Sequence, residues 1–222
     1  MTASAARSGD KASAAGSGDG ASAAGSGDGA SAAGSGERAG CYPGSFNPPT
    51  IAHLAIAEAA YRQCGLDRLD LVVSRVALGK AAPGGPRFDD RIAVLHTIAG
   101  TRPWLGVRVT DAQLLVDIAA GYDVLVVGAD KWAQVVDPAW YDGSIAARDD
   151  ALARLPKVVV APRPPWPVPT GRGLLLDDVH VPVSATGART VEPGWMAVEA
   201  AAFDARTGAW TDPERYRRGV ES

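Results

Sequence analysis

The stretch CYPGSFNPPTIAHL, residues 41–54, joins a short apolar segment to the start of an apolar helical pattern. Gly44 allows backbone dihedrals and close approaches that a side chain would forbid. The two prolines before Thr50 disfavour helix up to that point, which makes Thr50 the natural N-cap. His53 then lies in the first helical turn, where unpaired N–H groups and the positive end of the helix dipole favour phosphate. An imidazole there adds a donor that can become cationic. The same pattern also fits an ordinary capped helix with a solvated histidine.

Short β-branched runs follow this stretch along the chain. The near-continuous Val and Leu in them is typical of strands covered on both faces, as in a parallel sheet. The first strand, 39–42, is short and poor in β-branched residues, and a fifth candidate, VHVPV at 179–183, is weakened by its proline. The other expected strands are 70–76, Leu105–Thr110, 122–128 and Lys157–Ala161.

Helical patterns alternate with these runs. They cover Ile51–Cys64, 86–99 and 111–120, the last with Thr110 and Gln113 as a capping box. The β-α-β-α order predicts an α/β fold, a doubly wound (Rossmann-like), mostly parallel sheet of about five strands with helices on both faces. Ligands of such sheets bind beyond the carboxyl ends of the strands, where the strand order switches.

Residues 1–40 differ in composition from the rest. A nine-residue unit of Gly, Ala, Ser and Asp repeats there, and the segment has no Val, Ile, Leu or aromatic residue. Such a segment cannot offset the entropy of being ordered, and a calcium-binding β-roll would need a large apolar residue in each repeat. We therefore expect a disordered tail at 1–40, with no apolar secretory signal, and one domain at 41–222.

Composition narrows the possible partners. The tail carries a net charge of −1 and the whole chain −3, so the domain is near −2. This balance disfavours a protein that coats nucleic acid. Cys41 and Cys64 show no metal-binding spacing, and no apolar run approaches a membrane span. We expect a cytoplasmic protein without nucleic-acid or membrane partners, with homo-oligomerisation left open.

The first stretch resembles the first signature of the HxGH-type nucleotidyltransferases, G-x-F-x-P-x-[H/T]-x-x-H. Asn47 after the phenylalanine, and Thr50 in the first catalytic position, most resemble the nicotinamide/nicotinate mononucleotide adenylyltransferases. YPGSF is also similar to phosphopantetheine adenylyltransferase. The resemblance implies catalytic roles for Thr50 and His53, and nucleotide binding by Gly44, Ser45, Phe46 and Asn47.

VSATGAR, residues 183–189, resembles the second signature, I-S-S-T-x-x-R. The resemblance implies that Ser184 and Thr186 bind the β- and γ-phosphates of a nucleoside triphosphate. Arg189 would neutralise the departing pyrophosphate, a role that suits a guanidinium. Ala185 replaces the usual second serine, so one donor is lost. Alone, the segment also fits a capped turn with an exposed arginine.

VVGADKW, residues 126–132, resembles the Gly-Ala-Asp that follows a central strand in the mononucleotide enzymes. It implies that Gly128 and Asp130 bind the nucleotide and that Trp132 stacks on a base or pyridine ring. Lys80 would bind the acceptor's phosphate, and Arg91 would support its loop. The alternatives are a strand-end turn with a core tryptophan and a solvated lysine.

Three further observations complete the resemblance. APRPPWP, residues 161–167, is similar to the Arg-Pro that precedes the last signature, and it also fits a stiff connector. His96 and His180 are interpreted as structural. The Thr-His-Thr-like segment of the mononucleotide branch is missing near the third strand, and the C-terminal sequence is unlike the usual ending.

The resemblance implies an enzyme that transfers AMP from ATP, with Mg²⁺, to a phosphorylated small-molecule acceptor and releases pyrophosphate. Nicotinate or nicotinamide mononucleotide is the first candidate acceptor. Two alternatives stay open: an adenylyl- or cytidylyltransferase with another acceptor such as phosphopantetheine, and a nonenzymatic nucleotide-binding module. No protein metal ligands are expected.

Overall fold

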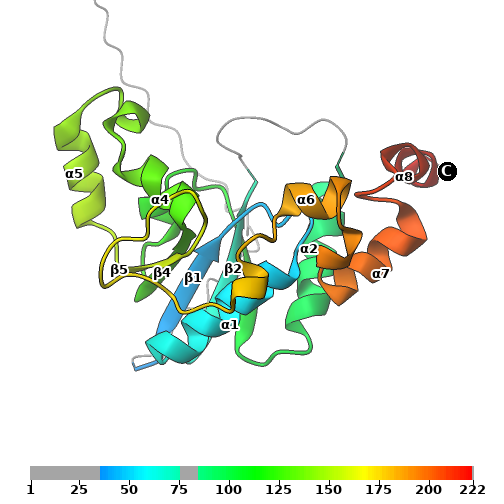
Figure 1. Ribbon diagram of the computed structural model, residues 1–222, viewed down its shortest axis with the longest axis horizontal. Helices are drawn as coiled ribbons and strands as arrows, with labels where there is room; N and C mark the ends of the chain where they lie inside the picture. Colours follow the sequence, from blue (N-terminus) through cyan, green and yellow to red (C-terminus); the bar gives the residue numbers. More distant parts are fainter. Residues whose placement is uncertain (1–35, 76–84, 222) are drawn as a thin grey trace, which may run out of the picture. The chain divides into compact units, whose positions relative to one another are not determined.

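The computed structural model describes residues 36–75 and 85–221 (Figure 1). Five parallel strands form one sheet in the order β3-β2-β1-β4-β5, which confirms the doubly wound parallel sheet. The strands are β1 (Ala39–Pro43), β2 (Arg68–Ser74), β3 (Leu105–Thr110), β4 (Val124–Gly128) and β5 (Lys157–Ala161). Of the expected strands, Leu105–Thr110 and Lys157–Ala161 match in full.

The central strand β1 explains the weakest part of the sequence pattern. Cys41 lies opposite Asp70 of β2 on one side and Leu125 of β4 on the other. A Cβ on Gly40 would come within 2.6 Å of the Leu66 side chain. Small residues therefore let β1 pack closely between neighbours. The strand order changes direction between β1 and β4, which places a ligand site beyond their carboxyl ends.

Helices cover both faces of the sheet (Figure 1). Helices α1 (Ile51–Cys64) and α2 (Phe88–Ala99) bury Ile56, Leu95 and Ile98 in the larger core cluster. Helices α3 (Leu115–Ile118) and α4 (Ala129–Val136) cover the other face, with α5 (Ile145–Ala153) packed on α4. The later elements are α6 (Ala185–Thr190), α7 (Val198–Thr207), α8 (Pro213–Val220) and the short 3-10 turns η1 (Pro138–Tyr141), η2 (Asp178–His180) and η3 (Pro193–Trp195).

Two sequence-based predictions are wrong. The helix expected at 111–120 begins only at Leu115, because the Thr110 hydroxyl accepts from the Ala112 N–H (3.1 Å) in a turn that follows the strand. Residues 179–183 do not form a strand. Asp177 caps the 3-10 turn η2 there through the Val179 N–H (3.2 Å). Beside β5, Val160 forms an isolated bridge with Gly173.

Both thiols, Cys41 and Cys64, are buried and free. Within the described ranges, no helix combines the length and the apolar composition that crossing a membrane requires.

Candidate active site

The predicted start of α1 is confirmed, and His53 is part of its capping. The His53 N–H donates to the Thr50 hydroxyl (3.3 Å), while the Thr50 N–H donates to His53 Nδ1 (3.0 Å). The hydroxyl and Nδ1 also lie 2.9 Å apart. These contacts form a capping box in which an imidazole takes the place of the usual Glu or Gln side chain. The ring is therefore fixed at the carboxyl edge of the sheet.

The same contacts fix the tautomer of His53. Because Nδ1 accepts from a backbone N–H, the proton of the neutral ring is on Nε2. Burial, and then the positive charge of Arg163, lower the pKa of His53 from 6.5 to about 4. The imidazole is thus a neutral donor near pH 7, whereas the sequence suggested a group that can become cationic.

Phe46, a residue with a strained backbone, packs against the His53 ring. Phe46 has φ 43°, a left-handed conformation that costs a residue with a side chain roughly 1–2 kcal/mol. Its ring is 1% exposed and contacts His53 edge-on at 5.1 Å between centroids. Burying a phenylalanine stabilises by roughly 1.5–3 kcal/mol, enough to offset the strain. Gly44 makes room, since a Cβ there would lie 2.9 Å from the Phe46 ring.

Donors from distant elements bind the carbonyls of this loop. Arg91 of α2 donates to the Ser45 carbonyl (2.9 Å), and Arg189 of α6 donates to the Asn47 carbonyl. The Arg91 side chain thus binds the first signature loop. The contact of Arg189 joins the two signatures, which lie far apart in the sequence.

The second signature forms the start of α6. Ser184 is its N-cap and accepts from the Gly187 N–H (2.9 Å), while Arg189 also donates to the Thr186 hydroxyl (3.2 Å). The Ser184 hydroxyl therefore caps α6. Thr186 is exposed to solvent.

The third segment lies at the end of β4. Gly128 precedes α4, and a Cβ there would lie 2.5 Å from an Asp130 carboxylate oxygen. Trp132 is half-buried against the smaller core cluster, and the Arg172 guanidinium lies 5.3 Å from its ring centroid. Lys80 lies outside the described residues.

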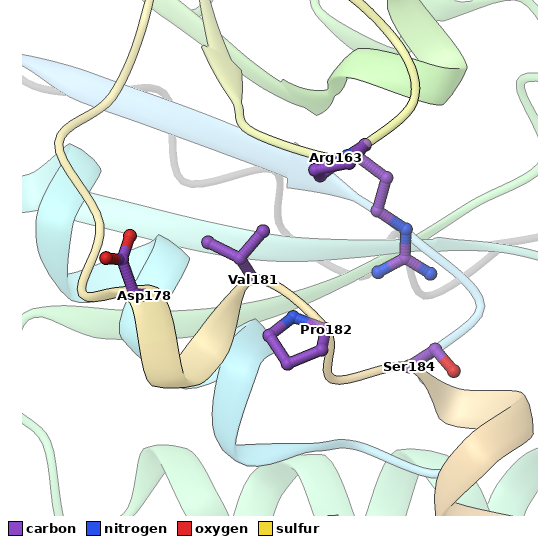
Figure 2. A pocket seen from close by; sticks show the side chains of 6 residues that line it. Arg163, Asp178, Val181, Pro182 and Ser184 are labelled. Atoms are coloured by element: carbon purple, nitrogen blue, oxygen red, sulfur yellow. The ribbon is translucent and has the colours of Figure 1, made fainter.

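A cleft of about 200 Å³ opens beyond the carboxyl ends of β1, β4 and β5. The predicted residues that line it are Gly44, Ser45, Thr50, His53, Gly128 and Asp130. Ser184 lines an adjoining hollow of about 620 Å³ (Figure 2). Phe46, Asn47, Trp132, Thr186 and Arg189 are outside the described lining of both. Phe46 and Arg189 instead pack or bond to the loop that forms the cleft wall.

Arg163 and His180 are cleft residues that the sequence analysis did not assign to the site. Figure 2 shows the Arg163 side chain reaching from beyond β5 toward the segment before Ser184. Its guanidinium donates to the Val183 carbonyl (3.0 Å) and lies 4.0 Å from the Asp130 carboxylate. The sequence feature that could have identified Arg163 is the Arg-Pro of APRPPWP, residues 161–167.

His180 is interpreted as structural on sequence, yet it lines the cleft in η2. Its Nδ1 is buried and has no hydrogen-bond partner among the described residues. The sequence analysis expected a strand at 179–183, whereas His180 ends the 3-10 turn η2.

The arrangement suits a phosphorylated ligand. His53 offers a neutral N–H at the amino end of α1, and the charges of Arg163 and Lys131 also line the cleft. Among the described residues that line the cleft, Asp130 is the one with an acidic side chain. No described group of three His, Cys, Asp or Glu side chains could hold a metal ion.

Comparisons with known proteins agree with this arrangement. The chain is 35% identical over 67 residues to a probable nicotinate-nucleotide adenylyltransferase of Treponema pallidum, covering 30% of this chain and 33% of that protein. It is 33% identical over 76 residues to a protein of the same name from Gloeobacter violaceus, covering 34% and 37%. The chain thus matches about a third of the length of these curated relatives.

Solved structures share the fold. Nicotinic acid mononucleotide adenylyltransferase of Plasmodium falciparum complexed with NaAD has a TM-score of 0.56 at 10% identity, over 78% of this chain and 97% of that one. Its complex with APC has a TM-score of 0.58 at 11% identity, with the same coverage. The cytidylyltransferase-like family matches residues 41–190, which include all three signature segments. The chain belongs to the cytidylyltransferase-like family.

Proposed function

We propose that the chain is an adenylyltransferase that transfers AMP from ATP to a phosphorylated acceptor. Nicotinate or nicotinamide mononucleotide is the first candidate for that acceptor. The observation that carries the proposal is the neutral His53 imidazole, fixed by Thr50 in a cleft beside the loop that Arg189 binds. The family and the names of the relatives support the same reaction class.

The reaction would proceed by in-line displacement. A phosphate oxygen of the acceptor forms a bond to the α-phosphorus of ATP, the bond from that phosphorus to the bridging oxygen breaks, and pyrophosphate leaves. His53 would donate its Nε2–H to an α-phosphate oxygen, aided by the amino end of α1. A donor of this kind contributes roughly 3–4 kcal/mol to transition-state stabilisation.

Other predicted residues take supporting roles in the proposal. Ser184, Thr186 and Arg189 would bind the β- and γ-phosphates, which requires Arg189 to share or exchange its contact with Asn47. Gly128 would allow close approach of the nucleotide, and Asp130 would accept from hydroxyls near the ribose. Lys80 and Trp132 stay predictions for the acceptor. Mg²⁺ bound to ATP would offset phosphate charge.

Pyrophosphate release tests the proposal. We expect release with ATP and Mg²⁺ in the presence of nicotinate or nicotinamide mononucleotide, with a dinucleotide as the second product. CTP is the matched control nucleotide, and phosphopantetheine the control acceptor. Release with CTP alone, or with phosphopantetheine alone, would assign the chain to the related transferases. Binding of ATP without release, for any acceptor of the panel, would favour the nonenzymatic module.

A further inference from the structure

The loop from Pro43 to Thr50 offers hydrogen-bond acceptors and is short of donors. Pro48 and Pro49 have no N–H, so this part of the loop lacks backbone donors for its own carbonyls. The late part of the chain supplies the missing donors. Besides the contact of Arg189 with the Asn47 carbonyl, the Ala197 N–H donates to the Pro49 carbonyl (3.0 Å).

The third donor is Trp210, which follows α7. Its indole Nε1–H donates to the side-chain oxygen of Asn47 (2.7 Å) across 163 positions of sequence. An indole can only donate, so this contact also fixes which amide atom of Asn47 faces the ring. Asn47 is thus bound twice, through its main chain by Arg189 and through its side chain by Trp210.

Trp210 is itself held rigidly. The residue is 3% exposed, and its ring contacts Phe203 of α7 at 5.8 Å between centroids. The Asp204 carboxylate accepts from the Trp210 N–H (2.6 Å), from the Thr211 N–H (3.1 Å) and from the Thr211 hydroxyl (2.6 Å). The indole therefore reaches Asn47 from a turn with little freedom.

We propose that Trp210 is a positioning residue of the adenylyl-transfer site. Only two prolines, whose φ angles are fixed, separate Asn47 from Thr50. Thr50 in turn fixes the His53 ring through its N–H and hydroxyl. The Trp210–Asn47 contact thus determines where the imidazole meets a substrate. The proposal rests on the proposed function, and it gives a role to the C-terminal segment that differs from the family's usual ending.

The decisive variant is Trp210→Phe, which keeps an aromatic ring and removes the Nε1–H. Because small misplacements of catalytic groups cost up to about 100-fold, we expect kcat to fall about 10- to 100-fold while KM for ATP changes less than threefold. Asn47→Leu removes the acceptor instead and should lower kcat similarly. The double variant should lose no more than the more impaired single variant, since both changes break one contact.

Tyr216→Phe is the matched control. The Tyr216 hydroxyl donates to the Asp90 carboxylate and accepts from the Arg87 N–H (2.9 Å). This variant therefore loses hydrogen bonds of the same C-terminal segment but leaves the contacts of Asn47 unchanged. Its kcat should stay at the wild-type value. A kcat for Trp210→Phe equal to that of Tyr216→Phe would overturn the positioning role, with both folds verified by circular dichroism and thermal melting.

Hydrogen exchange separates this inference from the proposed function. Peptides that cover residues 44–56 should exchange faster in Trp210→Phe than in Tyr216→Phe, whether or not the chain releases pyrophosphate. If the wild-type protein is inactive and the Trp210→Phe variant still exchanges faster, the proposed function is rejected. Trp210 then remains the residue that holds the loop. Unchanged exchange in this segment would reject the role of Trp210.

Discussion

His53 uses its two ring nitrogens for different tasks. Nδ1 completes the capping of α1, and Nε2 is left with the proton at the cleft. A single substitution can therefore test stability and catalysis separately, if the replacement side chain keeps only the capping acceptor.

His53→Ala removes both tasks, while His53→Gln keeps an acceptor at the third position of the helix, as in ordinary capping boxes. We expect kcat to fall about 10²- to 10³-fold in both variants, because the positioned imidazole donor is gone. Only the alanine variant should lose stability, by about 1 kcal/mol, the usual cost of a lost cap. Steady-state kinetics and urea unfolding measure the two effects. A fully active alanine variant would contradict the assigned role.

The lowered pKa of His53 predicts a dependence of stability on pH. Between pH 6.5 and about 4 the unfolded chain binds a proton at this residue and the folded chain does not, so acidification favours unfolding. We expect His53 to reduce the free energy of unfolding by up to roughly 3 kcal/mol across this window. His53→Gln should flatten the dependence there, as measured by urea unfolding at several pH values. Parallel profiles for both proteins would exclude the buried neutral ring.

Local sequence was enough to predict the Thr50 cap and the place of His53, because both depend on residues a few positions apart. The left-handed Phe46 was not predictable, since its strain is tolerated only through burial against Tyr42 and His53. Arg163 was noted for its motif, but its contacts with Val183 and Asp130 depend on the folded chain.

At the scale of elements, patterns of apolar residues predicted the strands and the first two helices well. They failed where a competing hydrogen bond decided the outcome. The Thr110 hydroxyl forms a turn in place of the expected helix start, and Asp177 caps the 3-10 turn η2 where a strand was expected at 179–183. Side-chain turns and edge pairing leave little trace in periodicity.

The turn after α7 carries an element-scale prediction. Asp204→Ala removes three hydrogen bonds to a buried carboxylate and should lower the free energy of unfolding by about 2–3 kcal/mol. Thr211→Val removes one of these bonds and should cost about 1 kcal/mol. Chemical denaturation of both variants gives the comparison. Equal losses would mean that the carboxylate does not organise the turn.

For the whole molecule, the alternation of strands and helices predicted the fold class and the edge of the sheet where the cleft lies. It did not predict that donors from α6 and from the turn after α7 bind the first loop. Those contacts join Asn47 to Arg189 and Trp210, and no local pattern encodes which distant donor meets which carbonyl.

The composition of residues 1–40 gives a prediction for the whole chain. β1 begins at Ala39, so removing residues 1–35 leaves every described strand intact. We expect the shortened protein to keep its melting temperature within about 1 °C and its kcat within twofold, because the segment has no Val, Ile, Leu or aromatic residue to add to a core. A clear loss of either would show that the segment takes part in the fold or the site.

Because the donors for the first loop come from Arg189, Ala197 and Trp210, the order of synthesis has a consequence. The five described strands are all synthesised before any of these three residues. A product cut short before Trp210 by a premature stop codon would contain all five described strands and lack the donor to the Asn47 side chain.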